Sequence, residues 1–193
     1  MRWQRSNVRP ESTIEPEAQS GYTCTASDMR ALLVERAWLS DLHSLQIDER
    51  TESWLADAAS WLGSHAADRE SLAQLVTLIF HYDAREILAA PEAHAVLLRE
   101  GARDVVRALA HEVLAGDAVD SDRFKQIVNT LKEKQGHGAR RLFYPIRLAL
   151  AGRIGEGELD RVIILIDRAA SAPGLAPVKA VRARILEFCA ALD

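Results

Sequence analysis

The chain has 193 residues, 48% of them hydrophobic, and a formal net charge of −4. This length can bury a core, and many Ala and Leu residues with few Gly and Pro favour helices over sheets. No apolar run reaches the roughly 18 residues that a membrane-spanning helix needs. The polar N-terminus is unlike a signal peptide, and two cysteines, Cys24 and Cys189, cannot build a zinc site alone. We expect a cytoplasmic protein without membrane, metal or cofactor.

The N-terminal stretch, residues 1–26, lacks apolar periodicity, so we expect a flexible arm. Ser27 is a suitable N-cap for a first helix. The next apolar stripe, from Trp54 to Leu62, repeats at helical spacing and stops at Gly63, where a C-terminal cap belongs. A third helix is expected from about Asp68.

The third helix is expected to bend near Tyr82. Pro91 can occupy the first turn of a fourth helix, because its missing N–H costs nothing there. That helix is expected to continue to Gly116, with Gly101 as a weak point in its interior.

A fifth helix is expected to begin after Asp120 or Ser121 and to end at Gly136. A loop follows, and Pro145 then opens a short helix that stops at Gly152. These elements place a glycine after each of two consecutive helices.

Two more helices complete the expected fold. The run from Val162 to Ile166 has strand propensity, but we predict a helix because no second strand exists to pair with it. Pro177 is expected to start the last helix. The sequence therefore predicts an all-α fold of about eight helices, in one elongated bundle or in two packed helical sub-bundles.

Charge divides the chain unevenly. Residues 1–122 carry 11 Lys/Arg and 21 Asp/Glu, a net charge of −10, whereas residues 123–193 carry 13 and 7, a net charge of +6. We expect a flexible arm at 1–26, an acidic helical bundle at 27–117 and a basic helical module at 118–193. The asymmetry indicates a polyanionic partner for one face, although ordinary solvated helix surfaces explain it equally well.

The sequence contains no pattern of catalytic residues. It has no Gly-rich phosphate loop and no Gly-x-Ser-x-Gly elbow, and its six histidines never share an i, i+3 or i+4 spacing. We therefore expect a protein that is not an enzyme.

One segment combines cations with aromatic rings: Arg140-Arg141-Leu142-Phe143-Tyr144-Pro145-Ile146-Arg147-Leu148-Ala149-Leu150-Ala151-Gly152. Guanidinium groups beside exposed aromatic faces can hold unstacked bases and phosphates. The alternative is a core turn in which the apolar side chains of the segment simply pack.

The stretch from Asp122 onward resembles the C-terminal anticodon-binding module of bacterial-type class I glutamyl-tRNA synthetases. Residues 145–152 match the family pattern Pro-(Leu/Ile)-Arg-x-Ala-(Leu/Val)-x-Gly. The Gly-Pro-x-Leu that follows in the family corresponds to residues 156–159, where Glu156-Gly157 replaces Gly-Pro. Helices upstream resemble the family more loosely, and class I lysyl-tRNA synthetases have a related region, so the identity of the tRNA stays open.

The resemblance implies which residues approach the anticodon. In the family, the motif arginine and the residues around Gly-Pro-x-Leu do so, which points here to Arg147, Glu156, Gly157 and Leu159. We add Arg140 and Arg141 as phosphate contacts. The acid at position 156 and the lost proline put ordinary anticodon discrimination in doubt.

The sequence lacks the Rossmann-type catalytic domain of a class I synthetase, with its His-x-Gly-His-like and Lys-Met-Ser-Lys-Ser-like motifs. We expect a free-standing tRNA-binding protein for the anticodon arm, with a tRNA resembling that for glutamate and a separate catalytic synthetase-like protein as partners. The alternative hypothesis is a repurposed helical module for protein interaction or regulation that no longer binds RNA.

Overall fold

The computed structural model describes residues 22–40, 47–136 and 138–193. Within these ranges the chain is helical, without strands, and has one isolated antiparallel bridge between Leu39 and Leu175. The helices are α1 (Ala26–Glu35), α3 (Glu49–Gly63), α4 (Arg69–Phe80), α5 (Ala84–Ala89), α6 (Pro91–Leu97), α7 (Ala102–Leu114), α8 (Ser121–Gln135), α9 (Ala139–Ala151), α10 (Gly157–Ala170) and α11 (Val181–Leu192). The expected all-α fold is confirmed.

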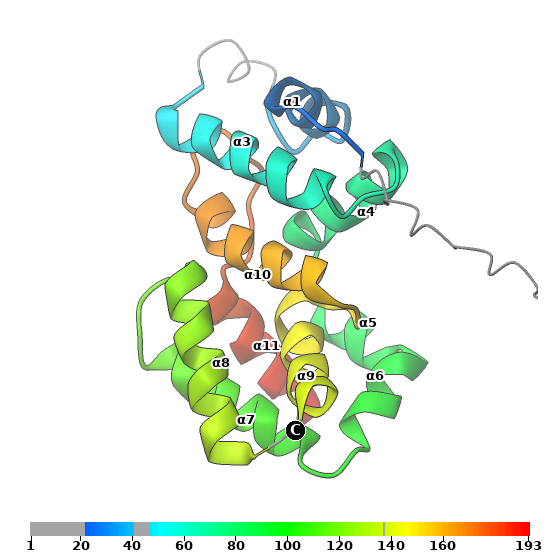
Figure 1. Cartoon of the computed structure of the whole chain (residues 1–193), viewed down its shortest axis with the longest axis vertical. Helices are drawn as coiled ribbons and strands as arrows, with labels where there is room; N and C mark the ends of the chain where they lie inside the picture. The colour runs from blue at the N-terminus through cyan, green and yellow to red at the C-terminus, as the bar shows by residue number, and fades with distance from the viewer. Residues whose placement is uncertain (1–21, 41–46, 137) are drawn as a thin grey trace, which may run out of the picture.

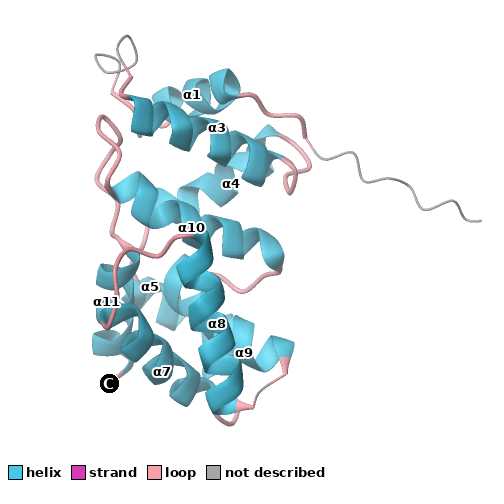
Figure 2. Cartoon of the chain, turned by 60° about the vertical axis from the view of Figure 1, so that its left-hand side comes forward, coloured by secondary structure: helices cyan, strands magenta, loops and turns pink. Residues whose placement is uncertain are grey.

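The helices form an elongated molecule with α10 near its middle (Figure 1). In this view α1, α3 and α4 lie above α10, while α5 to α9 and α11 lie below it, and Figure 2 shows the same division from another side. α10 contacts α3 and α4 as well as α9, so it joins the upper and lower groups of helices.

The central position of α10 explains its unusual sequence. The five residues from Val162 to Ile166 are all buried, which a helix achieves only when neighbours cover it on several sides. The expected helix is therefore confirmed, and its strand-like composition reflects burial between the two groups of helices.

The hydrophobic core is continuous through the described part of the chain and receives residues from each of these helices. Trp54 of α3 is fully buried and donates its indole N–H to the carbonyl of Leu165 in α10, at 3.0 Å. Trp38 stacks on Phe80 of α4, with ring centroids 4.8 Å apart. The expected division into an arm, an acidic helical bundle and a basic helical module remains a prediction.

Polar side chains cap the N-termini of several helices. Asp68 and Asp120 each accept the backbone N–H three residues on. The cap at Asp120 was expected, and α4 begins directly after Asp68, where a helix start was expected. The expected cap at Ser27 is wrong, because Thr25 and Asp28 form a capping box two residues earlier. Within residues 22–26 of the expected arm, Tyr22 donates its N–H to the carbonyl of Ala66 and Thr25 caps α1, while residues 1–21 lie outside the described part of the chain.

Two glycines end helices as expected. Gly136 and Gly152 take left-handed conformations, with φ of +62° and +76°, directly after α8 and α9. Gly101 also has a positive φ, +78°, and splits the expected fourth helix into α6 and α7. Gly63 is not a left-handed cap but the last residue of α3, where a Cβ would lie 2.8 Å from the Cβ of Cys24.

Proline lies at the expected helix start in one case and inside a helix in another. Pro91 is the first residue of α6, as expected. Pro145 lies inside α9, which begins six residues earlier at Ala139, so the expected start is wrong. The missing N–H of Pro145 removes the partner of the Arg141 carbonyl, but Arg141 is at the exposed end of the helix. The packing of buried residues such as Ile146 outweighs this loss.

The last helix begins at Val181 and not at Pro177. The preceding segment is held against the chain after α1, since the N–H of Ala176 donates to the carbonyl of Trp38 at 2.7 Å. The carboxylate of Asp167 in α10 accepts the N–H of Val181 at 2.7 Å. These tertiary contacts, which no local pattern reveals, set the start of α11. The bend expected near Tyr82 is a complete break between α4 and α5.

Candidate nucleic-acid interface

An open groove of about 490 Å³ lies between α8, α9 and α10. α8 contributes polar and apolar side chains, α9 contributes an aromatic ring, and the first two turns of α10 form the third side. The lining residues are His65, Ser121, Phe124, Lys125, Val128, Asn129, Phe143, Gly157, Asp160, Arg161 and Ile164. Of the family-like motif, the groove therefore contains Gly157 from the second part, whereas residues 145–152 of the first part do not line it.

Arg147 lies beside the groove but is buried, with a side chain only 7% exposed. Its Nε and Nη2 donate to the two carboxylate oxygens of Asp160, at 2.8 and 2.9 Å. Its Nη1 donates to the carbonyl of Gly155 at 2.7 Å. All three nitrogens thus have partners within the chain, and the bidentate pair with Asp160 ties α9 to α10.

Two phenylalanines line the groove: Phe124 of α8, which is buried, and Phe143 of α9. The ring of Phe143 is partly exposed, and the guanidinium carbon of Arg147 lies 4.8 Å from the ring centroid. Since Arg147 is itself held by Asp160, this cation–π contact restrains the ring from one side.

The turn before α10 holds the other predicted residues. Leu159 is buried, Gly157 opens onto the groove, and Glu156 is exposed near Arg147. A Cβ added at Gly157 would meet no atom within 4 Å, so the start of α10 is open space. The structure brings Gly157 to the groove, while Leu159 anchors the turn in the core.

Arg140 and Arg141 are exposed in the first turn of α9. They do not line the groove and lie instead beside Tyr144, toward α6 and α7. The structure therefore separates these two arginines from the other predicted residues.

Two cations in the groove were not predicted from the sequence. Lys125 of α8 is exposed and pairs with Asp122 at 3.3 Å, and the guanidinium carbon of Arg161 in α10 lies 5.7 Å from the ring centroid of Trp61. Exposed ion pairs are weak, so Lys125 can exchange partners readily. Its spacing of four residues from Asn129 on an exposed helix face was the one signal in the sequence.

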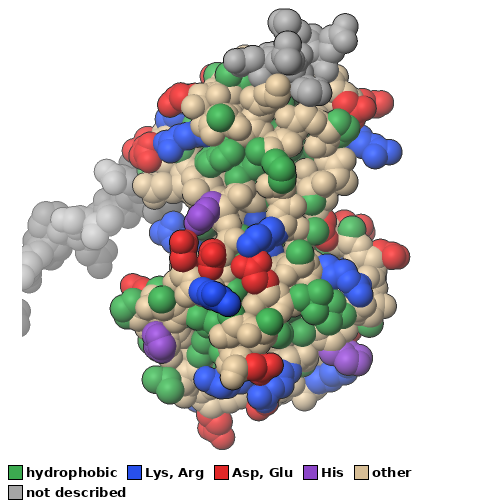
Figure 3. Space-filling view, turned by 180° about the vertical axis from the view of Figure 1, so that it is seen from behind, with side chains coloured by type: hydrophobic (Ala, Val, Ile, Leu, Met, Phe, Trp, Pro, Cys, Tyr) green, Lys and Arg blue, Asp and Glu red, His purple; other side chains and the backbone are tan. Residues whose placement is uncertain are grey.

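Charge elsewhere is mixed. The face opposite to that in Figure 1 carries acidic and basic side chains close together across its middle (Figure 3). Where this face is described, the neighbouring charges of opposite sign reduce the field available to attract a polyanion.

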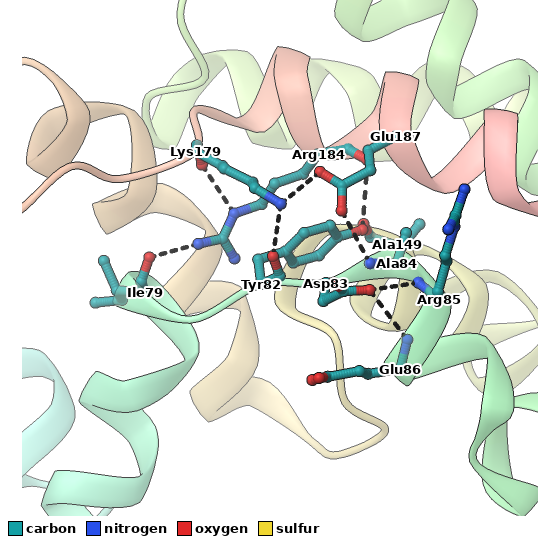
Figure 4. Close-up of polar contacts among 10 residues, drawn as sticks. All are labelled: Ile79, Tyr82, Asp83, Ala84, Arg85, Glu86, Ala149, Lys179, Arg184 and Glu187. Atoms are coloured by element: carbon teal, nitrogen blue, oxygen red, sulfur yellow. Dashed lines mark hydrogen bonds and ion pairs between the residues drawn. The ribbon is translucent and has the colours of Figure 1, made fainter.

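A buried polar network positions the other end of α9 (Figure 4). Arg184 of α11 is completely buried and donates to the backbone carbonyls of four residues: Leu78, Ile79, Leu150 and Lys179. Burial lowers its pKa to about 10, so it stays cationic at neutral pH. This one side chain joins the ends of α4 and α9 to the start of α11.

Tyr82 extends the same network. Its ring centroid lies 4.7 Å from the guanidinium carbon of Arg184, and its hydroxyl donates to the carbonyl of Ala149 in α9. Burial raises the pKa of the Tyr82 hydroxyl, so the hydroxyl keeps its proton for this bond. The network holds α9, and with it the motif residues, against the rest of the fold.

A family model described as an anticodon binding domain matches residues 30–171. A glutamate–tRNA ligase of Bacillus thuringiensis is 27% identical over 124 residues, which are 63% of this chain and 24% of that protein. Glutamate–tRNA ligases of Bacillus cytotoxicus and Oceanobacillus iheyensis are 27% and 26% identical over 127 and 125 residues, 65% of this chain and 25% of each.

The chain thus spans about a quarter of the length of these curated relatives. No solved structure is a significant match. Within the described residues, none of the helices has both the length and the apolar character needed to cross a membrane.

Proposed function

This chain belongs to the anticodon-binding domain family, and we propose that it binds tRNA through the groove between α8, α9 and α10. The observation that carries the proposal is the joint presence of Phe143, Lys125 and Arg161 in one groove next to the family-like motif. A partly exposed ring in a groove that also holds cations suits an unstacked RNA base and its phosphate.

Each groove residue has a distinct part in this proposal. Phe143 stacks on a base, and its contact with Arg147 restrains the ring before RNA arrives, which lowers the entropic cost of binding. Lys125 and Arg161 contact phosphates. The amide of Asn129 can both donate to and accept from a base edge.

The residues expected from the sequence keep a role in the proposal. Arg147 acts indirectly, by holding the turn at Gly155 and the ring of Phe143. Gly157 leaves room for a base at the start of α10, and Leu159 anchors that turn. Glu156 is exposed directly before α10, and its carboxylate repels a phosphate at this edge of the groove. Arg140 and Arg141 contact phosphates outside the groove.

We infer that the protein holds the anticodon arm of a tRNA resembling that for glutamate and has no aminoacylation chemistry of its own. A separate synthetase-like protein would act at the acceptor end. The family match and the glutamate–tRNA ligase relatives support this proposal, and we place the protein in the cytoplasm.

The test is filter binding of a glutamate tRNA transcript at low and at moderate salt. We expect binding that weakens with salt, with a slope of roughly 0.7 to 0.9 logarithmic units per phosphate contacted. Phe143→Leu should weaken binding by about 1 to 3 kcal/mol, the range for one base on an aromatic ring. Lys125→Gln and Arg161→Gln should each lower both the affinity and the salt slope.

Arg85→Gln is the matched control, because Arg85 is an exposed arginine on α5, away from the groove. It should bind tRNA as the wild type does. If the wild-type protein binds no tRNA even at low salt, the proposal fails. The alternative of a helical module for protein interaction then becomes the better account, and RNase-insensitive capture of a protein partner would support it.

A further inference from the structure

A second group of side chains lies on the α6 and α7 side of α9. Its members, which we call the α6–α9 cluster, are Leu98, Arg99, Arg140, Arg141 and Tyr144. All except Leu98 line a shallow cleft between α9 and the turn that joins α6 to α7. The cleft encloses essentially no free volume, so it is a surface crevice and not a small-molecule pocket.

The turn between α6 and α7 presents an apolar and a cationic side chain together. Leu98 is 84% exposed, far more than is usual for a large hydrophobic residue. The guanidinium carbon of the next residue, Arg99, lies 5.8 Å from the ring centroid of Tyr144 in α9. This contact joins Arg99, from the acidic residues 1–122, to Tyr144, from the basic residues 123–193.

The cluster has excess positive charge. Across the described ranges, no carboxylate forms an ion pair with Arg99, Arg140 or Arg141, and the acidic residue lining the cleft is Glu100. The first turn of α9 contains no acidic residue. Arg140 and Arg141 lie at the positive end of the α9 dipole, where cations do not stabilise a helix. An anion bound from outside would offset this unfavourable charge.

We propose that the α6–α9 cluster is a second RNA contact, which binds the sugar–phosphate backbone of the stem of the RNA whose loop occupies the groove. This proposal rests on the proposed function. Three arginines can hold phosphates by paired hydrogen bonds, and Leu98 and Tyr144 can cover the apolar edge of a ribose. Because phosphate contacts position an RNA without reading its sequence, the cluster would set the register of the anticodon arm.

The cluster and the groove can be tested separately with two probes. One is a full glutamate tRNA transcript, and the other is a single-stranded oligoribonucleotide with the anticodon-loop sequence, which lacks the stem. The variants are the double change Arg140→Gln with Arg141→Gln, and the single changes Arg99→Gln and Leu98→Ser. Thermal unfolding confirms that each variant is folded.

We expect the double variant to bind the transcript about tenfold or more weakly at moderate salt, and to lower the salt slope by about one to two logarithmic units. Arg99→Gln and Leu98→Ser should show smaller losses in the same direction. Binding of the single-stranded oligoribonucleotide should not change, because that probe reaches only the groove. Phe143→Leu should weaken binding of both probes.

Two results would overturn this inference while leaving the proposed function intact. One is a set of cluster variants that bind the transcript as tightly as the wild type while Phe143→Leu does not. The other is an equal loss for both probes, which would assign the cluster to the loop and not to the stem. If the wild type binds neither probe, the proposed function fails and the cluster proposal falls with it.

Discussion

Two buried arginines hold α9 in place by different means. Arg147 is paired with the carboxylate of Asp160, whereas Arg184 is surrounded by backbone carbonyls from α4, α9 and the start of α11. The family-like motif singled out Arg147 but could not show whether its guanidinium faces RNA or a neighbouring helix. Arg184 had one signal in the sequence, its place on an apolar helix face with Val181 and Phe188. Three of its four carbonyl partners, Leu78, Ile79 and Leu150, are distant in sequence and could not be predicted.

Asp160→Asn distinguishes an indirect role of Arg147 from direct contact with RNA. If Arg147 acts by holding the turn before α10, loss of the carboxylate should weaken tRNA binding and reduce the free energy of unfolding by about 1 to 3 kcal/mol. If Arg147 contacts RNA directly, removing a negative charge should leave tRNA binding unchanged or improve it. Filter binding and urea unfolding of the same preparations measure both quantities.

Arg184→Met should destabilise the protein by about 3 to 5 kcal/mol, because four carbonyls lose their shared donor in the interior. Arg184→Lys should recover only part of this loss, since a compact ammonium cannot span carbonyls from three segments. Urea unfolding followed by circular dichroism measures the change. Equal stability of the Met variant and the wild type would mean that the network contributes nothing to folding.

At the scale of helices, the sequence correctly predicted the helix ends that a single residue determines. Gly136 and Gly152 end their helices because each adopts a left-handed conformation. The wrong predictions came where packing between distant segments competes with local preference. α9 continues through Pro145, and α11 starts where Asp167 accepts a backbone N–H. Phe143 lay in the segment noted from the sequence, but Lys125 and Arg161 join it only through the packing of α8 and α10.

The cap of α5 should make stability depend on acidity. The carboxylate of Asp83 accepts the N–H groups of Glu86 and Arg85, and these bonds hold its pKa below the ordinary value of 3.8. Because the folded pKa is the lower one, this stabilisation is present above pH 3.8 and is lost as the pH falls through the folded value.

Asp83→Asn keeps the capping oxygen but cannot titrate. The wild type should therefore be more stable than the variant at neutral pH, and the difference should shrink below pH 3.8. Urea unfolding of both proteins across the acidic range gives the difference directly. A difference that stays constant with pH would show that the carboxylate charge is not involved.

Surface charge and core packing divide the whole molecule differently. The charge pattern places a boundary near residue 118, but α10 packs on α3 and α4, and α11 packs on α5 and α7. The sequence predicted helices from their own apolar periodicity, which does not tell which helices become neighbours. The basic part of the sequence after residue 118 supplies most of the surface proposed to bind RNA. The folding unit, in contrast, includes helices from both sides of residue 118.

We therefore expect residues 118–193, produced alone, not to fold. α10 would lose its cover over apolar residues such as Leu165, and the indole of Trp54 that bonds to the Leu165 carbonyl would be absent. The full chain should unfold in a single cooperative transition, whereas the fragment should bind a hydrophobic dye and melt without a sharp transition. A cooperative melt of the fragment would instead make the basic module a folding domain, and its tRNA affinity could then be measured without the acidic half. Since Arg99 is absent from the fragment, that affinity would also show what the turn between α6 and α7 adds.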